Sequence, residues 1–363
     1  MKEDLAARRI IVIGTGLIGT SIALAMRGRG AEVLLSDRDA SSLDLAVELG
    51  AGTALPEGGS VGRADLAVLA VPPAAVAPVL LDAQKRDLAA VYTDVASVKA
   101  LPLAEAAELG CDLDSFVAGH PLAGSERSGP AAARADLFLG RTWALCPGDG
   151  TDPAALDLVR SLAVACGAKP LVVEAARHDR AVALVSHAPH VVSAAVAARL
   201  RGADDVALGL AGQGVRDVTR IAASDPGLWV GILSANAGPV AEVLDEVATD
   251  LAVAAALLRD GGEDAMDHVV DLLTQGNTGR SRIPGKHGGR QSRYAVVPVV
   301  IPDRPGELAL LFQAAGVAGV NIEDVVIEHS PGLAVGVVQL SVEPAAAGRL
   351  AEELRARGWS VPG

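Results

Sequence analysis

A glycine-rich motif between a strand and a helix constrains the fold of this chain more than any other feature. Arg9 to Ile13 is a short apolar strand, Gly14 to Gly19 has the sequence GTGLIG, and an Ala-, Leu- and Ile-rich helix continues to about Arg27. A second strand, Ala31 to Ser36, ends at Asp37. Strand, tight turn, helix, strand and acid follow one another in this order in dinucleotide-binding βαβ units, so the sequence predicts a Rossmann-type domain.

Each part of this motif has a physical role toward a dinucleotide. Gly14 permits the turn, Gly16 lets the backbone approach the pyrophosphate, and Gly19 lets the helix pack on the sheet. The helix N-terminus adds partial positive charge. A carboxylate at Asp37 would accept hydrogen bonds from the ribose hydroxyls and repel a 2′-phosphate, which favours NAD, although Arg38 beside it leaves NADP open. The candidate cofactor-binding residues are Gly14, Thr15, Gly16, Leu17, Ile18, Gly19, Asp37, Arg38 and Pro72.

The alternation of strands and helices continues to about residue 175. A helix from about Ala40 to Leu49 precedes a buried strand, Asp65 to Val71, which Pro72 and Pro73 close. Later strands are predicted at Ala90 to Asp94, Phe116 to Ala118, Thr142 to Cys146 and Lys169 to Glu174, with a helix that Asp152 and Pro153 open. The sequence therefore predicts an α/β nucleotide-binding domain over residues 1–175.

Two polar side chains follow strand ends in this domain. Ser97 lies in the loop after Asp94, and His120 follows Phe116 to Ala118, before a Gly-, Pro- and Ser-rich loop. Ligands of open α/β sheets bind outside the carboxyl ends of the strands, so both side chains can reach a nicotinamide there. His120 is the candidate catalytic base. Ser97 also fits the N-cap of a helix that begins near Lys99, and His120 also fits a loop-capping role.

Residues 176–276 have an almost wholly helical pattern that is apolar nearly all round, which implies burial on several sides and favours a dimer. At about 100° per residue, His187 and His190 share a helix face, whereas His178 lies about half a turn away and is expected at the helix start or behind the site. Pro189 should kink this helix and free the carbonyl of Val185. Because no cysteine or dense carboxylate cluster accompanies the histidines, they do not favour a metal site.

A second cationic segment lies further along the helical domain. Arg216 and Arg220 share a helix face, with Asp217 in reach of Arg220 for a surface ion pair. A guanidinium is also the best fork for a carboxylate. Trp229, near the start of the next helix, is expected either in the core or at a pocket wall.

Beyond the helical domain the composition changes twice. Residues 277–293 are Gly-rich and strongly basic, which predicts a solvated linker or a cationic loop that closes over an anionic substrate. Residues 294–363 have the order βαββαβ, with a turn at Pro331 and Gly332 and a helix opened by Asp303 and Pro305. This order is typical of a ferredoxin-like module.

The composition excludes several classes of partner. The 44 acidic and 31 basic residues give a net charge of −13, which argues against a nucleic acid or an anionic membrane surface. Cys111, Cys146 and Cys166 are widely spaced and are expected to be reduced, as in a cytoplasmic protein. The first residues mix both charges and no apolar run reaches ~20 residues, so neither a signal peptide nor a membrane span is expected.

Together these features suit the oxidation of an alcohol on an anionic substrate. Hydride would pass to a nicotinamide, a histidine would take the hydroxyl proton, and an arginine would bind a carboxylate. Composition and spacing do not name the substrate.

The chain resembles the prephenate/arogenate dehydrogenase family over essentially its full length. The residues that carry the resemblance are GTGLIG at 14–19, DVASVK at 94–99, GHPLAGSERSGP at 119–130, HD at 178–179, SHAPH at 186–190 and DVTRI at 217–221. The C-terminal module is similar to an ACT domain, with DRPGEL at 303–308 as its signature turn.

The resemblance implies NAD-dependent oxidative decarboxylation of prephenate to 4-hydroxyphenylpyruvate in tyrosine biosynthesis. It implies that His120 deprotonates the ring hydroxyl, that Ser97 orients it, and that Arg220 binds a substrate carboxylate. The other family pocket positions fall on His187 and His190 at the side-chain end of the substrate, and on Glu126, His178 and Trp229. Arg216 stands where many relatives carry a lysine. The similarity to an ACT domain implies a small-molecule ligand but does not identify it, and tyrosine as an inhibiting effector is the hypothesis. The homodimer is the expectation from the apolar helical domain.

Three alternatives stay open. Arogenate carries an amino group where prephenate has a keto group, and no residue separates the two substrates at this stage. A non-catalytic ACT-type amino-acid sensor is disfavoured by the intact set of Ser97, His120 and Arg220, and a 6-phosphogluconate-type reductase would be expected to have a lysine-centred site. The predicted organisation is an NAD-binding Rossmann domain (1–175), an all-α substrate and dimerisation domain (176–276), a basic linker (277–293) and an ACT domain (294–363).

Overall fold

The computed structural model of the chain describes residues 5–56, 62–124, 128–284, 294–329 and 334–362. Contacts within the chain divide it into two compact units, Met1–Ala248 and Thr249–Gly363. The division falls inside one long helix, α11 (Ala237–Asp260).

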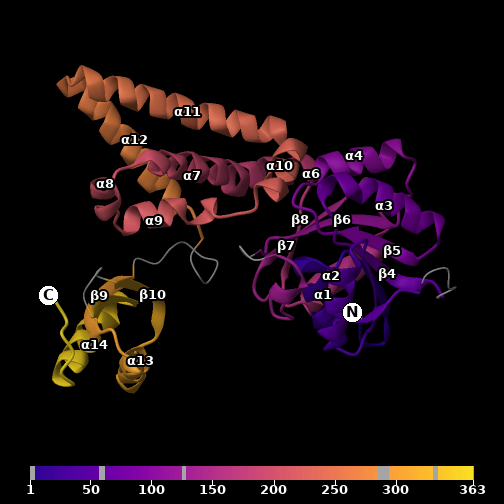
Figure 1. The fold of residues 1–363 in the computed structure, drawn as a ribbon, viewed down its shortest axis with the longest axis horizontal. Helices are drawn as coiled ribbons and strands as arrows, with labels where there is room; N and C mark the ends of the chain where they lie inside the picture. Colours follow the sequence, from indigo (N-terminus) through magenta and orange to yellow (C-terminus); the bar gives the residue numbers. More distant parts are fainter. Residues whose placement is uncertain (1–4, 57–61, 125–127, 285–293, 330–333, 363) are drawn as a thin grey trace. The chain divides into compact units, whose positions relative to one another are not determined.

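An eight-stranded sheet with the order β3-β2-β1-β4-β5-β6-β7-β8 forms the centre of the first unit (Figure 1). Neighbouring strands are parallel except for β6 and β7. The strand order reverses at β1, which lies between β2 and β4, and the crevice at such a reversal is where open α/β sheets bind their ligands. The strands are β1 (Arg9–Ile13), β2 (Glu32–Ser36), β3 (Thr53–Ala54), β4 (Ala64–Leu69), β5 (Ala89–Asp94), β6 (Phe116–Pro121), β7 (Thr142–Pro147) and β8 (Lys169–Val172).

Helices cover both faces of this sheet, because successive strand residues point to opposite sides. Ile10 and Val12 pack in one apolar cluster with α1 and α5, whereas Ile11 packs in a second cluster with α3 and α4. The sequence predicted this α/β layering and the cap of α5, where Asp152 accepts a hydrogen bond from the Ala154 N–H. The helices are α1 (Leu17–Arg27), α2 (Ala40–Glu48), α3 (Pro73–Lys85), α4 (Ala100–Glu108) and α5 (Pro153–Ala165), with 3₁₀ turns η1 (Leu5–Ala7) and η2 (Pro130–Ala132).

Two details around the predicted site differ from the sequence-based expectation. β6 continues through His120 to Pro121, because it pairs with the antiparallel β7 and places His120 opposite Ala144. His120 therefore belongs to a strand end rather than to a loop. The N-cap of α4 is Lys99, so of the two roles considered for Ser97, that of helix cap is contradicted.

The first unit continues as a helical segment. It contains α6 (Ala175–Val182), the π-helical turn η3 (Ala183–His187), α7 (Ala188–Arg199), η4 (Leu200–Gly202), α8 (Asp205–Gly209), α9 (Gln213–Thr219), η5 (Arg220–Ala222) and α10 (Pro226–Ala235). The distortion predicted near Pro189 is the π-helical turn, in which the Ala188 N–H bonds to the Ala183 carbonyl. Pro189 has no N–H to offer to Val185, so the regular helical ladder is interrupted there.

The helical segment is apolar on more sides than the chain itself buries. Leu184 and Val185 are 59% and 66% exposed, and Leu210 is 81% exposed. Among the described residues, the run Ala175–Gly202 is long and apolar enough to cross a membrane by length and composition, but it also carries the buried side chains of His178, Asp179 and His187. We interpret it as a helix of the folded domain with an uncovered apolar side.

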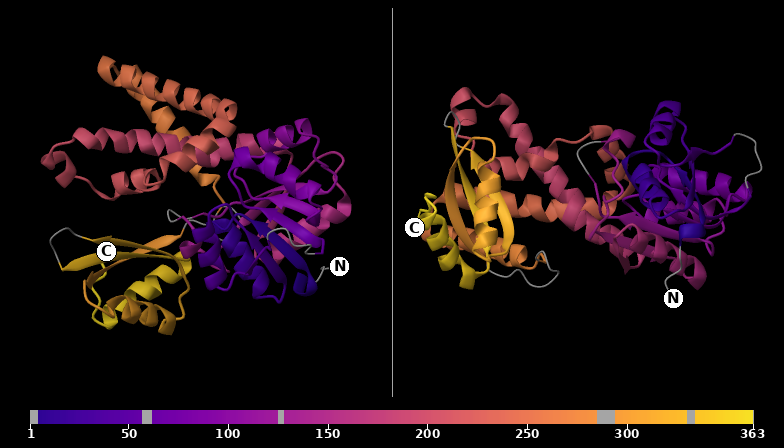
Figure 2. Two further views of the ribbon diagram at one scale, coloured as in Figure 1. Left: turned by 45° about the vertical axis from the view of Figure 1, so that its right-hand side comes forward. Right: turned by 90° about the horizontal axis from the view of Figure 1, so that it is seen from below.

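The second unit contains the end of α11, α12 (Glu263–Ser281) and a three-stranded antiparallel sheet with the order β10-β11-β9. Its strands are β9 (Ala295–Pro302), β10 (Ile322–His329) and β11 (Val335–Val342), and its helices α13 (Glu307–Val317) and α14 (Pro344–Ala356) cover one face of the sheet (Figure 2). The predicted final strand is reduced to one bridge between Ser360 and Val300.

Two predicted boundaries in this unit are wrong. Residues 277–281, predicted as linker, are the end of α12, where the hydroxyls of Thr278 and Ser281 bond to carbonyls of the preceding turn. Helix α13 starts after Gly306, whose φ is +92°, so Pro305 lies in the turn rather than in the helix. Residues 285–293 and the predicted turn at Pro331 and Gly332 lie outside the described part of the chain.

Candidate active site

The glycine-rich turn after β1 leaves open space at the N-terminus of α1. A Cβ on Gly14, whose φ is +103°, would lie 2.2 Å from the Ala70 carbonyl oxygen, so packing against the end of β4 requires glycine there. Gly16 is different, because no atom of the described residues lies within 4 Å of the position of its Cβ. Gly16 is also the N-cap of α1, and no described side chain caps this helix. The first N–H groups of α1 are thus placed to bind a pyrophosphate.

Asp37 is tied to this turn. Its Oδ2 accepts hydrogen bonds from the N–H and the hydroxyl of Thr15, at 2.5 and 2.9 Å, and its Oδ1 accepts from the Asp39 N–H at 2.9 Å. The carboxylate is therefore held beside the entrance to the turn, where a ribose would lie. Arg38 is exposed next to it, and Pro72 caps α3 at the end of β4. Leu17 and Ile18 form the first turn of α1.

A buried ion pair joins the loop that carries Ser97 to the strand that carries His120. The Lys99 ammonium, which is fully buried, pairs with the Asp94 carboxylate and donates to the Gly119 carbonyl at 2.6 Å. Asp94 also accepts from the N–H groups of Gly119 and Ala96, at 3.0 and 2.9 Å. These bonds hold the loop after β5 against the end of β6, and we call these two segments the two edge loops. Ser97 lies between Asp94 and Lys99 in the sequence and is half-buried.

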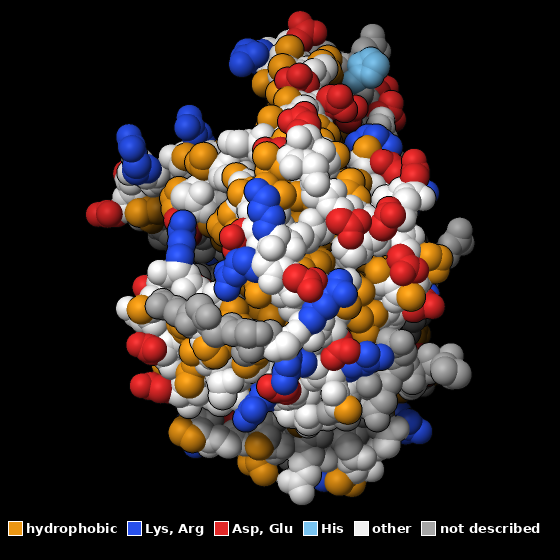
Figure 3. Space-filling model, turned by 90° about the vertical axis from the view of Figure 1, so that its right-hand side faces the viewer, with side chains coloured by type: hydrophobic (Ala, Val, Ile, Leu, Met, Phe, Trp, Pro, Cys, Tyr) orange, Lys and Arg blue, Asp and Glu red, His pale blue; other side chains and the backbone are white. Residues whose placement is uncertain are grey.

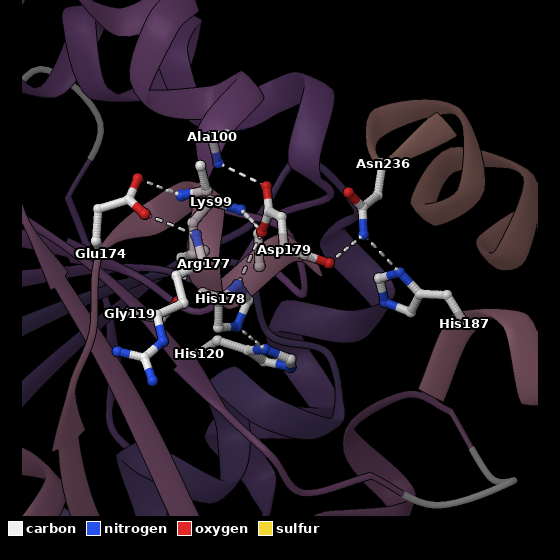
Figure 4. Close-up of polar contacts among 12 residues, drawn as sticks. Lys99, Ala100, Gly119, His120, Glu174, Arg177, His178, Asp179, His187 and Asn236 are labelled. Carbon is white, nitrogen blue, oxygen red and sulfur yellow. Dashed lines mark hydrogen bonds and ion pairs between the residues drawn. The ribbon is translucent and has the colours of Figure 1, made fainter. Parts of the chain in front are cut away.

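His120 is the end of a hydrogen-bonded chain that starts at Asp179 (Figure 4). Glu174 caps α6 by accepting from the N–H groups of Ala176 and Arg177, and His178 and Asp179 lie in the first two turns of this helix. The Asp179 carboxylate lies 2.8 Å from Nδ1 of His178, and Nε2 of His178 lies 2.9 Å from Nδ1 of His120. Asp179 also accepts from the N–H groups of Lys99 and Ala100, at 2.9 and 2.8 Å, and so caps α4.

This chain of bonds determines where the protons lie. A carboxylate only accepts, so Nδ1 of a neutral His178 carries the proton and its Nε2 accepts from the Nδ1–H of His120. The lone pair of His120 then lies on Nε2, the nitrogen that points away from His178. Burial, followed by the charges of His178 and Lys99, holds the pKa of His120 well below its usual range. His120 is thus an uncharged base at neutral pH.

The rings of His187 and His190 both contact the indole of Trp229, as expected for two residues on a common helix face. The ring of His190 stacks on Trp229 with 3.6 Å between centroids, and His187 meets Trp229 edge-on at 6.1 Å. Both imidazoles are buried, and burial lowers the pKa of His190 and lowers that of His187 to about 4. Trp229 itself is half-buried, which places it between core and surface.

The predicted arginine face is only partly present. Helix α9 ends at Thr219 and Arg220 begins a 3₁₀ turn, so Arg216 and Arg220 do not share one regular helix. Both side chains are exposed, and Asp217 accepts a hydrogen bond from Gln213 at 2.8 Å. The segment is anchored to α7 because the Ser193 hydroxyl donates to the Val218 carbonyl at 2.7 Å. Glu126 lies outside the described residues.

Sequence reasoning gave no role to four residues around the histidines, although three of them lie in the motifs DVASVK (94–99) and HD (178–179). Asp94, Lys99, Asp179 and Asn236 are all fully or almost fully buried. The available signal was the presence of charged residues at strand and helix ends within apolar segments. This signal could not identify their hydrogen-bond partners, because those partners are distant in sequence. Within the described ranges, no group of three or more His, Cys, Asp or Glu side chains could hold a metal ion.

The sequence of the chain matches known families over most of its length. The model of the prephenate dehydrogenase nucleotide-binding domain matches residues 22–172, and that of the prephenate dehydrogenase dimerization domain matches residues 174–275. The chain belongs to the prephenate dehydrogenase family. Its Rossmann-type domain is therefore followed by the family's helical dimerisation domain.

Relatives and solved structures agree with this assignment. The chain is 43% identical to a probable prephenate dehydrogenase from Streptomyces niveus, over 97% of this chain and 99% of the relative. It is 31% identical to the crystal structure of Synechocystis arogenate dehydrogenase, with a TM-score of 0.63 over 75% of this chain and 98% of the other. The A. aeolicus prephenate dehydrogenase in complex with hydroxyphenyl propionate and NAD+ is 26% identical, with a TM-score of 0.66 over 75% and 98%.

Proposed function

We propose that the chain oxidises prephenate to 4-hydroxyphenylpyruvate with NAD. The single observation that carries this proposal is the hydrogen-bonded chain from Asp179 through His178 to Nδ1 of His120, which makes Nε2 of His120 the acceptor at the carboxyl edge of a dinucleotide-binding sheet in a prephenate dehydrogenase family member. Bound NAD supplies the hydride acceptor. The hydride leaves the ring carbon that bears the hydroxyl group, the bond to the ring carboxylate breaks, and CO₂ departs as the ring becomes aromatic.

The residues of the chain bind and orient the substrate and transfer one proton in this reaction. Nε2 of His120 accepts the hydroxyl proton as hydride leaves and returns it to the same oxygen when the loss of CO₂ makes the ring aromatic, while its Nδ1–H stays bonded to His178. Ser97, free of a capping role, is available to hydrogen-bond the same hydroxyl. Arg220 binds a substrate carboxylate, since a guanidinium offers two parallel donors, and His187, His190 and Trp229 form the wall at the side-chain end. The role of Glu126 stays a sequence-based expectation.

The test is an assay of the purified full-length chain with prephenate or arogenate and with NAD or NADP, following the reduced cofactor. We expect turnover with prephenate and NAD. Absence of turnover with both substrates and both cofactors would contradict the proposal.

Replacing Asp37 by serine is expected to lower kcat/KM for NAD by about 10–100-fold and to raise the relative use of NADP. The reason is the loss of a charged acceptor for the ribose hydroxyls, each such hydrogen bond contributing about 1.5–3 kcal/mol, while Arg38 remains beside a 2′-phosphate. Initial rates with the two cofactors measure the ratio. Asp39→Asn is the control, because Asp39 caps α2 in the same loop, and it should leave the ratio unchanged.

We also propose that residues 294–362 form an ACT domain that binds tyrosine. The three-stranded sheet with its βαββα order supports this, as does a cavity of about 80 Å³ lined by Asp303, Arg304, Leu308 and Ile327. If tyrosine inhibits the full-length chain, Asp303→Ala should raise the tyrosine concentration needed for half-inhibition at least about tenfold, since the ammonium loses an acceptor. An unchanged inhibition curve would place the effector site elsewhere.

For partners and location we propose a cytoplasmic homodimer that binds neither nucleic acid nor membrane. The exposed apolar side chains of α7, α8 and α10 would be covered by a second copy, in line with the matched dimerization domain. Cys111, Cys146 and Cys166 are unpaired thiols. Basic side chains lie among acidic ones on the face shown in Figure 3, so a polyanion would meet mixed charge there.

A further inference from the structure

The buried amide of Asn236 determines the proton position on His187. Its Nδ2 lies 2.9 Å from the backbone carbonyl of Asp179 and 3.1 Å from Nδ1 of His187 (Figure 4). A backbone carbonyl can only accept, so the nitrogen of the amide must face Asp179 and give it one hydrogen. The second hydrogen of the same nitrogen is directed at Nδ1 of His187, which must therefore accept.

It follows that the proton of a neutral His187 is on Nε2. The imidazole is 2% exposed and sits among Asn236, Asp179 and the edge of Trp229. Burial lowers the pKa of His187 to about 4 and so keeps the ring uncharged at neutral pH, although the charge of the Asp179 carboxylate raises this pKa. In Figure 4 its second ring nitrogen faces away from Asn236, on the side where the ring of His120 lies. This nitrogen is a hydrogen-bond donor.

The two imidazoles therefore present opposite functions. His120 presents a lone pair on Nε2 because the Asp179 carboxylate acts through His178, and His187 presents an N–H because the Asp179 carbonyl acts through Asn236. Asp179 of α6 therefore determines the proton position on both histidines, through its carboxylate for His120 and through its backbone carbonyl for His187. An acceptor fits a hydroxyl that must lose its proton, and a donor fits a substrate oxygen.

We propose that Asn236 and the Asp179 carbonyl hold His187 as a fixed hydrogen-bond donor, which makes the site selective for a 2-oxo acid side chain over the corresponding 2-amino acid side chain. The inference rests on the proposed function, in which His187 lies at the side-chain end of the substrate. The keto oxygen of prephenate accepts the Nε2–H. The ammonium group of arogenate offers only hydrogens at this position, so two donors would face each other in a buried site.

The test compares kcat/KM for prephenate and arogenate in the full-length chain and in three variants. We expect the wild type to prefer prephenate by at least about 100-fold, since a site built around one hydrogen bond strongly rejects a substrate that cannot make it. Asn236→Ala frees His187 to place its proton on Nδ1 and should reduce the preference at least about tenfold. His187→Glu, whose carboxylate only accepts, should invert it. A general loss of folded enzyme would lower both kcat/KM values together and leave their ratio unchanged.

Gln84→Ala is the matched control. Gln84 also donates its amide to a backbone carbonyl, that of Asp112 at 2.7 Å, but on α3 away from the histidines. The substrate ratio of this variant should equal that of the wild type. Comparable use of both substrates by the wild type, or the wild-type ratio in both Asn236→Ala and His187→Glu, would overturn the inference.

A second readout is independent of turnover. In the protein labelled with ¹⁵N-histidine, the signals that disappear in His187→Glu belong to His187 and report its tautomer. We expect the Nε2–H form in the wild type and a mixture in Asn236→Ala. The Nδ1–H form in the wild type would contradict the inference. Absence of turnover with both substrates would instead contradict the proposed function, and the NMR result would still decide the tautomer.

Discussion

Replacing His120 by asparagine is expected to reduce kcat by about 10²–10⁴-fold, the usual contribution of a positioned general base. Asparagine can still donate its amide to Nε2 of His178, so the neighbouring bonds have a partner, but it has no basic nitrogen for the hydroxyl proton. The dissociation constant of NAD should change little, because the dinucleotide turn at Gly14 to Gly19 is on a different strand. Steady-state rates and a fluorescence titration with NAD measure the two effects.

The control for this substitution is His268→Asn, at an exposed position on α12. It should leave both kcat and NAD affinity unchanged. A kcat of His120→Asn within about threefold of the wild type would remove His120 from the role of base.

The pH profile offers an independent check of the same residue. Burial and the charges of His178 and Lys99 lower the pKa of His120 below its usual 6.5. A lowered pKa means less of the protonated, inactive form at any given pH. The kcat/KM, which reports the pKa of the free enzyme's base, should therefore stay level as the pH falls through 6.5 and decrease only below it. A decline centred at or above 6.5 would contradict the assignment.

Replacing Lys99 by methionine is expected to cost about 3–5 kcal/mol of unfolding free energy. The substitution keeps an unbranched side chain of similar length but leaves the Asp94 carboxylate buried without its cation, and it removes the donor to the Gly119 carbonyl. Breaking a buried ion pair from one side is far more costly than removing both partners, because a desolvated charge is left behind. Urea unfolding followed by circular dichroism measures the loss.

Two further variants separate this cause from simple truncation. Lys85→Met at the exposed end of α3 should cost within about 0.5 kcal/mol, the usual range for surface substitutions. The double variant Asp94→Asn with Lys99→Met should recover part of the loss, since the uncompensated charge is gone. If Lys99→Met is as stable as Lys85→Met, the pair does not hold the two edge loops together.

Features encoded within a few neighbouring residues were predictable from the sequence. The GTGLIG turn and Asp37 are close together in the chain, and their strand, turn and helix pattern is sufficient to identify them. The common face of His187 and His190 followed from helical periodicity, and Trp229 lies against both. The prediction that His120 lies near a strand end is confirmed, but the strand continues one residue past His120 because it pairs with the antiparallel β7.

Features that depend on distant partners were not predictable in this way. Helical periodicity predicted that His178 lies off the face of the other two histidines, but it could not show that His178 bonds to His120, 58 residues earlier. The cap of α4 was assigned to Ser97 as one alternative, whereas Asp179, 80 residues after Lys99, supplies it. The end of α12 was predicted as linker because residues 277–293 are Gly-rich and strongly basic, but the hydroxyls of Thr278 and Ser281 bond to carbonyls of the preceding turn and the helix continues there.

The sequence by itself determined the Rossmann-type domain and the helical domain after it, and it placed His120 at a strand end of the sheet, because local patterns of apolar, glycine and polar residues encode each of these features. Only the tertiary structure decided which nitrogen carries the proton in His120, His178 and His187. That choice depends on Asp179 and Asn236, whose hydrogen bonds join elements far apart in the chain, and the spacing of residues along a chain contains no record of such bonds.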